Sequence, residues 1–194
     1  MKTKLYLVGL ATAAIATAAS AVPVDVPGTI TFTGAIVATS CKVNGGSGAT
    51  NISVDMGTVA TDDVGPASNP TILPGGLGRK TFDIVCKAGP TKVSMKFAGT
   101  AAELKQGSTV LRVNNGNTSA GYAQGVGIAV YPGTGGGTAY NLASGELVHE
   151  AAVDATSGAT IPVTFTAVYV QEPAGATPTG GQANASLPFT LTYE

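Results

Sequence analysis

VPVDVPGTITF at residues 22–32 and ANASLPFTLTYE at residues 183–194 are the two stretches that decide the fold. In each, apolar or small residues occupy every second position, which places them on one face of an extended strand. The first set comprises Val22, Val24, Val26, Gly28, Ile30 and Phe32. The second comprises Ala183, Ala185, Leu187, Phe189, Leu191 and Tyr193, with Glu194 left over. Long, half-apolar strands near both ends of a sequence are typical of segments that pair with another chain.

Residues 1–21 have the pattern of a secretory signal peptide. Lys2 and Lys4 precede an apolar, alanine-rich run, and Ala19-Ser20-Ala21 matches the small-residue cleavage site. The apolar run is shorter than the roughly 20 residues that a membrane-spanning helix needs. We therefore expect cleavage after Ala21 and export, with an uncleaved membrane anchor as the alternative.

The composition indicates a weakly charged protein. Charged residues make up 11% of the chain, against the roughly 25% that is usual, and the formal net charge is −1. Removal of Lys2 and Lys4 would make the net charge more negative. This balance does not favour nucleic acid as a partner, because such proteins present a basic face. A weakly charged surface suits a protein that is mostly covered by neighbours.

Cys41 and Cys86 are the two cysteines of the chain. Export to an oxidising compartment makes a disulfide between them the default. Two cysteines with a single histidine do not make a zinc site.

The remaining sequence predicts an all-β fold with one domain. Strand-like runs recur between clusters of Gly, Pro, Asn and Ser, at spacings that fit a β-sandwich. We expect a long loop over residues 62–78, a short helical turn near residues 101–106, and an edge or bulge where Pro188 interrupts the last strand. The expected strands lie at residues 30–41, 51–59, 82–86, 93–97, 110–113, 126–130, 161–169 and 183–193.

Five blocks, in order, resemble the chaperone–usher fimbrial subunits of the type 1 pilin-like family. They are GTITFTGAIVATSC at 28–41, KTFDIVC at 80–86, TKVSMKFAG at 91–99, QGVGIAVY at 124–131 and GGQANASLPFTLTYE at 180–194. The resemblance implies an incomplete immunoglobulin-like β-sandwich that a donor strand from a neighbouring subunit completes. It implies three parts: a cleaved signal peptide at 1–21, an N-terminal donor-strand extension at 22–33 and a pilin domain at 34–194.

The same resemblance implies a structural subunit of a surface fimbria that supports adhesion. A periplasmic chaperone would fill the groove first, and the next subunit would replace it at the outer-membrane usher of a Gram-negative bacterium. The donor residues would be the alternating set from Val22 to Phe32. Gly28 would then meet a shallow place in the groove, although a flexible turn after Pro27 is the other reading. The groove edge and the residues that the chaperone recognises would be Leu187, Phe189, Leu191, Tyr193 and Glu194. Tyr193 could equally be an aromatic that closes the core.

Other function classes have weaker support. A minor adaptor or a sugar-binding adhesin of the same fibre is the main alternative, and an enzyme is disfavoured because no catalytic constellation is present. We expect no cofactor, metal, small-molecule substrate or nucleic acid. His149, flanked by Glu146 and Glu150, reads as an exposed loop or strand-end residue. Asp62-Asp63 lacks further calcium ligands, and the glycine-rich loop at 133–137 lacks the remainder of a phosphate-binding motif. The three glycosylation sequons, at Asn51, Asn117 and Asn184, read as coincidence.

Overall fold

The computed structural model describes Thr33, residues 41–43 and residues 51–194. The elements described below belong to the unit formed by residues 37–194. The predicted signal peptide and the predicted donor residues Val22, Val24, Val26, Gly28, Ile30 and Phe32 lie outside the described residues. Within the described part, no helix is long and apolar enough to cross a membrane.

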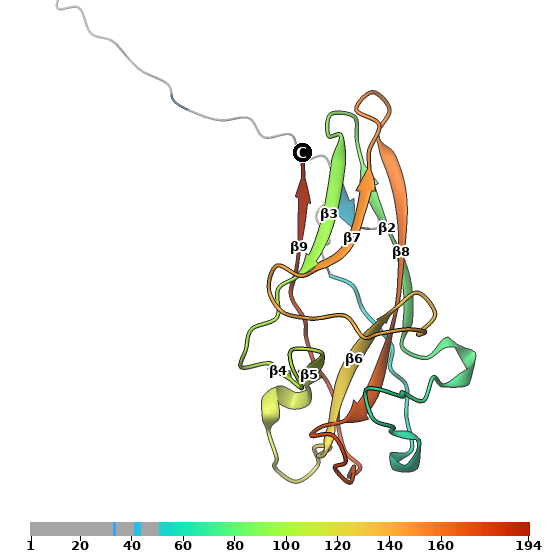
Figure 1. Cartoon of the computed structure of the whole chain (residues 1–194), viewed down its shortest axis with the longest axis vertical. Helices are drawn as coiled ribbons and strands as arrows, with labels where there is room; N and C mark the ends of the chain where they lie inside the picture. The colour runs from blue at the N-terminus through green and yellow to red at the C-terminus, as the bar shows by residue number, and fades with distance from the viewer. Residues whose placement is uncertain (1–32, 34–40, 44–50) are drawn as a thin grey trace, which may run out of the picture. The chain divides into compact units, whose positions relative to one another are not determined.

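Nine strands and three short 3-10 helices make up the described part (Figure 1). The strands are β1 Cys41–Val43, β2 Arg79–Cys86, β3 Lys92–Phe97, β4 Leu104–Lys105, β5 Val110–Arg112, β6 Val126–Pro132, β7 Leu147–Ala152, β8 Ala159–Gln171 and β9 Phe189–Tyr193. The 3-10 helices are η1 Thr61–Asp63, η2 Pro74–Gly76 and η3 Val113–Gly116. One antiparallel sheet has the order β1-β2-β8-β6-β5-β4, and the other has the order β7-β3-β9.

The two sheets enclose one main core, which confirms the predicted immunoglobulin-like β-sandwich. Period-two alternation directs one set of side chains inward from each strand, as Phe82 and Ile84 of β2 and Val163 and Phe165 of β8 show. Phe82 and Phe165 meet edge-to-face with ring centroids 6.0 Å apart. Val93, Met95 and Phe97 of β3 enter the same core from the other sheet.

A second, smaller apolar cluster lies on the other face of the six-stranded sheet. It explains why β6 is buried along almost its whole length rather than at alternate positions. Tyr131 of β6 donates a hydrogen bond of 2.6 Å from its hydroxyl to the carbonyl of Ala67, in the loop predicted at residues 62–78. That loop therefore covers the outer face of the sheet, and a strand buried on both faces loses its alternation.

Cys41 and Cys86 form the predicted disulfide. The two residues lie directly opposite each other in the β1–β2 ladder, with Cα atoms 3.9 Å apart. The bridge fixes β1 at the edge of the six-stranded sheet.

Three sequence-based expectations need correction. Residues 51–59 belong to no strand, and Gly57 within them has a φ of 58°. The last strand is β9 alone, shorter than the predicted 183–193. The short helical turn expected near residues 101–106 is a single turn before β4, in which Glu103 N and Leu104 N both donate to the carbonyl of Thr100, at 3.0 and 3.2 Å. His149 is not an exposed loop or strand-end residue: it is the third residue of β7, half-buried, and its Nε2 is buried without a hydrogen-bond partner among the described residues.

Candidate strand-accepting groove

β9 is an edge strand within the described part of the chain. It pairs with β3 on one side, and no described strand lies on its other side. Glu194 N donates to the carbonyl of Lys92 at 3.0 Å, and Ala98 N donates to the carbonyl of Pro188 at 2.9 Å. Backbone groups alternate in direction along a strand, so Phe189, Leu191 and Tyr193 direct their N–H and C=O groups toward the open edge. The edge therefore offers a ladder to another strand.

The side chains of these edge residues face inward. Phe189, Leu191 and Tyr193 lie directly opposite Phe97, Met95 and Val93 in the β3–β9 ladder, and opposite residues share one face of a sheet. Phe189 and Leu191 are half-buried against the main core, while Tyr193 is 36% exposed. The open edge and the apolar side chains thus border the same space.

The segment 51–56 forms the opposite wall of that space. Its side chains alternate: Ile52, Val54 and Met56 are half-buried against the core, and the residues between them are exposed. No backbone group of residues 51–54 hydrogen bonds to another described segment, whereas the carbonyl of Asp55 accepts from Gly78 N at 2.9 Å. This wall has the shape of a strand but lacks a ladder partner within the described residues.

Between the two walls lies a groove with a volume of about 810 Å³. Both sheets contribute to its floor, through Met95 and Phe97 of β3, Leu111 of β5, Ile128 and Val130 of β6, and Phe165 and Ala167 of β8. The other residues that line it are Cys41, Asn51, Ile52, Val54, Met56, Ala185, Ser186, Leu187, Pro188, Phe189, Leu191 and Tyr193. None of them is charged. Well-packed cores contain few voids larger than a water molecule, so the sandwich is incomplete along this groove.

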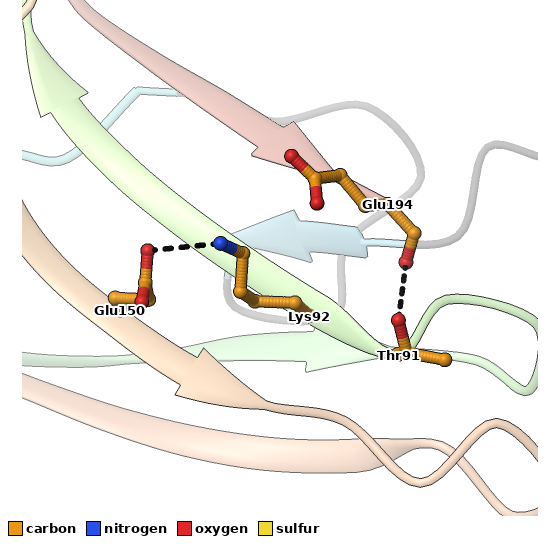
Figure 2. Close-up of polar contacts among 4 residues, drawn as sticks. All are labelled: Thr91, Lys92, Glu150 and Glu194. Carbon is orange, nitrogen blue, oxygen red and sulfur yellow. Dashed lines mark hydrogen bonds and ion pairs between the residues drawn. The ribbon is translucent and has the colours of Figure 1, made fainter.

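The chain after β9 is held at the β2–β3 turn (Figure 2). The carbonyl oxygen of Glu194 accepts hydrogen bonds from Thr91 N at 2.6 Å and from the Thr91 hydroxyl at 3.3 Å. Lys92 lies next to this contact, but its ammonium is 3.3 Å from Glu150 Oε2 on β7, directed away from Glu194. Among the described residues, no lysine or arginine forms an ion pair with Glu194.

Leu187 continues the apolar edge beyond β9. An ideal Cβ at Gly99 would lie 3.1 Å from Leu187 Cδ1 and 3.0 Å from Leu104 Cδ1, so both leucines pack closely over the bare backbone of Gly99. The structure thus brings together four of the five residues assigned to the groove edge, Leu187, Phe189, Leu191 and Tyr193, as lining residues. Glu194 lies beyond them, at the turn.

Sequence reasoning missed one wall of the groove. The alternation of residues 51–59 was visible, but it predicted a paired strand rather than an unpaired wall. The remaining candidates lie away from the groove: Glu146 and His149 are at or beside β7, Asp62 and Asp63 are in η1, and the loop 133–137 follows β6. Among the described residues, no group of three or more His, Cys, Asp or Glu side chains is placed to hold a metal ion.

The fold is an all-β sandwich with an apolar groove where one strand is missing. These two features define the class of this protein. The sequence model of the fimbrial protein family matches residues 30–194. The chain therefore belongs to the fimbrial protein family, and it is a structural pilus subunit. This assignment does not favour the sugar-binding adhesin.

Solved structures similar to the chain include two P pilus subunits. The P pilus adaptor subunit PapF is 24% identical with a TM-score of 0.49, and the match covers 80% of this chain and 96% of that one. The P pilus rod subunit PapA is 23% identical with a TM-score of 0.46, and the match covers 86% of this chain and 100% of that one. A comparison with curated proteins finds no match.

Proposed function

We propose that the groove accepts an N-terminal strand, residues 22–33, from a neighbouring copy of the chain or from another subunit of the same pilus. The single observation that carries this proposal is the uncharged groove between the open edge of β9 and the unpaired wall at 51–56. A strand in this position would bond to β9 on one side and to the wall on the other. β-strand addition of this kind obtains affinity from main-chain hydrogen bonds and specificity from alternate side chains.

The proposed donor matches the groove in length and in pattern. The groove edge from Ala185 to Tyr193 spans nine residues, as does the donor from Val24 to Phe32. Nine residues of extended chain reach about 30 Å. Val24, Val26, Ile30 and Phe32 would face the floor, with Gly28 at a shallow point. Burial of these four side chains would contribute on the order of 10 kcal/mol before the cost of ordering the strand.

An empty apolar groove would promote aggregation before assembly. A second partner would therefore cover the groove until the donor strand arrives. A periplasmic chaperone would fill the groove first, recognising the apolar edge and the segment that ends at Tyr193 and Glu194. The next subunit would replace it at the outer-membrane usher, and repetition would build a non-covalent polymer outside a Gram-negative cell. The chain would do no catalysis, and no cofactor would take part.

A self-complemented fusion tests the proposal. A second copy of residues 22–33, joined after Glu194 through a flexible linker, should fill the groove of its own chain. We expect a monomer with a far higher Tm than the unfused chain and no polymerisation. A matched fusion of the same length, with Val24, Val26, Ile30 and Phe32 of the added copy changed to serine, should melt like the unfused chain. Equal melting temperatures for the two fusions would show that the groove does not accept this strand.

A further inference from the structure

Asn114 makes three of the hydrogen bonds that hold the end of the groove edge far from Glu194. At the same place Gln182 N donates to the carbonyl of Gly121 at 2.9 Å, and its carbonyl accepts from Ala123 N at 2.9 Å. Asn114 lies in η3, directly after β5, and has a backbone φ of 50°, in the left-handed region. Its backbone N–H donates to the carbonyl of Asn184 at 2.7 Å. Its side-chain Oδ1 accepts from Asn184 N at 3.0 Å, and its Nδ2 donates to the carbonyl of Gln182 at 2.5 Å. One residue thus makes three hydrogen bonds to the segment 182–184.

Asn115, the next residue, has the same backbone conformation as Asn114 but not its side-chain hydrogen bonds. Asn115 has nearly the same φ, 52°, and is exposed, but makes no side-chain hydrogen bond within the described residues. Asparagine tolerates the left-handed region better than most residues, which accounts for both positions. It does not account for the three bonds, which Asn114 alone of the two makes.

Segment 182–184 leads directly into the part of the groove edge that has least support. Residues 185–187 line the groove, yet their backbone hydrogen bonds to no other described segment. The next contact along the chain is the bond from Ala98 N to the Pro188 carbonyl. Ala185, Ser186 and Leu187 therefore lie between the Asn114 contact and the Ala98 contact without a backbone hydrogen bond to another described segment. The Tyr169 hydroxyl adds a bond of 2.8 Å to the carbonyl of Ala183.

We propose that Asn114 is a positioning residue for strand acceptance, which rests on the proposed function above. By fixing residues 182–184 to the end of β5, it holds Ala185–Leu187 extended and in line with β9. An incoming strand then finds a continuous edge instead of one that must first become ordered. Preorganised binding surfaces gain affinity because less freedom is lost on binding.

Two glycine variants make a matched test. Asn114→Gly keeps the left-handed backbone accessible and removes both side-chain bonds, and Asn115→Gly makes the same change where no such bond exists. The exported chain, from Val22 onward, would be refolded with a labelled synthetic peptide of residues 22–33, and dissociation would be followed after adding excess unlabelled peptide. We expect the peptide to leave Asn114→Gly roughly tenfold faster than wild type, which corresponds to about 1.4 kcal/mol. Asn115→Gly should stay within about twofold of wild type.

Amide hydrogen exchange on the peptide complexes distinguishes positioning from general stability. In Asn114→Gly, protection should be lost at Ala185 and Leu187 and retained at Phe189–Tyr193. Equal loss along the whole edge, or dissociation rates equal to wild type, would overturn this inference while leaving the proposed function intact. If the wild-type chain does not bind the peptide at all, both are wrong. If Asn114→Gly does not accumulate as folded protein, Asn114→Asp should show the same local change in exchange, because it keeps the acceptor for Asn184 N but replaces the donor to Gln182 with a carboxylate oxygen that the Gln182 carbonyl repels.

Discussion

Met95 lies directly opposite Leu191 in the β3–β9 ladder, and both side chains line the groove. Met95 is 1% exposed because β3 sits in the middle of its sheet, whereas Leu191 on the edge strand is only half-buried. The core is thus complete on one side of this pair and open on the other. A donor strand in the groove would cover the exposed part of Leu191, and its effect on stability can be measured there.

Leu191→Ala should cost more stability in the self-complemented fusion than in the unfused chain. With the donor in place, Leu191 would be enclosed, and truncation of an enclosed leucine costs about 2–5 kcal/mol. In the unfused chain the same side chain borders open space and the loss should be smaller. Thr190→Ala, on the same strand but with its side chain exposed, is the control. Unfolding by urea gives all four differences, and identical losses in both forms would count against a donor at Leu191.

Removal of the disulfide should destabilise the chain substantially. Cys41 and Cys86 close a loop with a sequence separation of 45, for which the chain-entropy model gives about 4 kcal/mol. A Cys41→Ser, Cys86→Ser double variant of the fusion, unfolded in guanidinium chloride, should show a loss of this order. The wild-type fusion treated with a reductant provides the matching comparison. A loss below about 1 kcal/mol in both experiments would show that β1 is held by its ladder alone.

Gly99→Ala should destabilise the chain, because no space exists for a methyl group. Its Cβ would meet the Leu142 carbonyl oxygen at 2.5 Å as well as the two leucine methyl groups. Overpacking of this kind costs about 1–3 kcal/mol, and here it would also displace Leu187 from the groove edge. Gly136→Ala is the control, since its Cβ would meet nothing within 4 Å. Thermal unfolding should lower the Tm for Gly99→Ala alone, and equal Tm values for both variants would contradict the packing described here.

Acid sensitivity should depend in part on Asp154. Its Oδ1 accepts hydrogen bonds from the backbone N–H groups of Thr156 at 2.7 Å and Ser157 at 3.1 Å, and these bonds lower the pKa of the carboxyl below its ordinary value of 3.8. A lowered folded-state pKa contributes stability above the unfolded-state pKa, and this is lost as the pH falls through the folded-state value. Asp154→Asn should therefore flatten the decline in unfolding free energy below about pH 4. An unchanged acid limb in urea titrations at successive pH values would refute this role.

The sequence by itself determined the all-β class, the disulfide and most of the core strands. Period-two alternation identified β2, β3, β6 and β8 because these strands have one face in the main core, and burial enforces that pattern. It also placed apolar residues on the edge that becomes β9. β7 was missed because its sequence, LVHEAA, does not alternate between apolar and polar residues, and Leu147 at its start is 51% exposed.

Only the tertiary structure decided where the groove lies and what holds its edges. Alternation fixes which face of a segment is buried, but it does not say whether a partner strand lies alongside, so residues 51–56 and β9 have the same pattern and different pairing. The floor joins Met95, Ile128 and Phe165, which no local pattern connects. The Asn114 contacts depend on a loop approaching a segment about 70 residues away. Contacts of this kind arise only when distant segments pack together, because their geometry depends on the whole fold rather than on neighbouring residues.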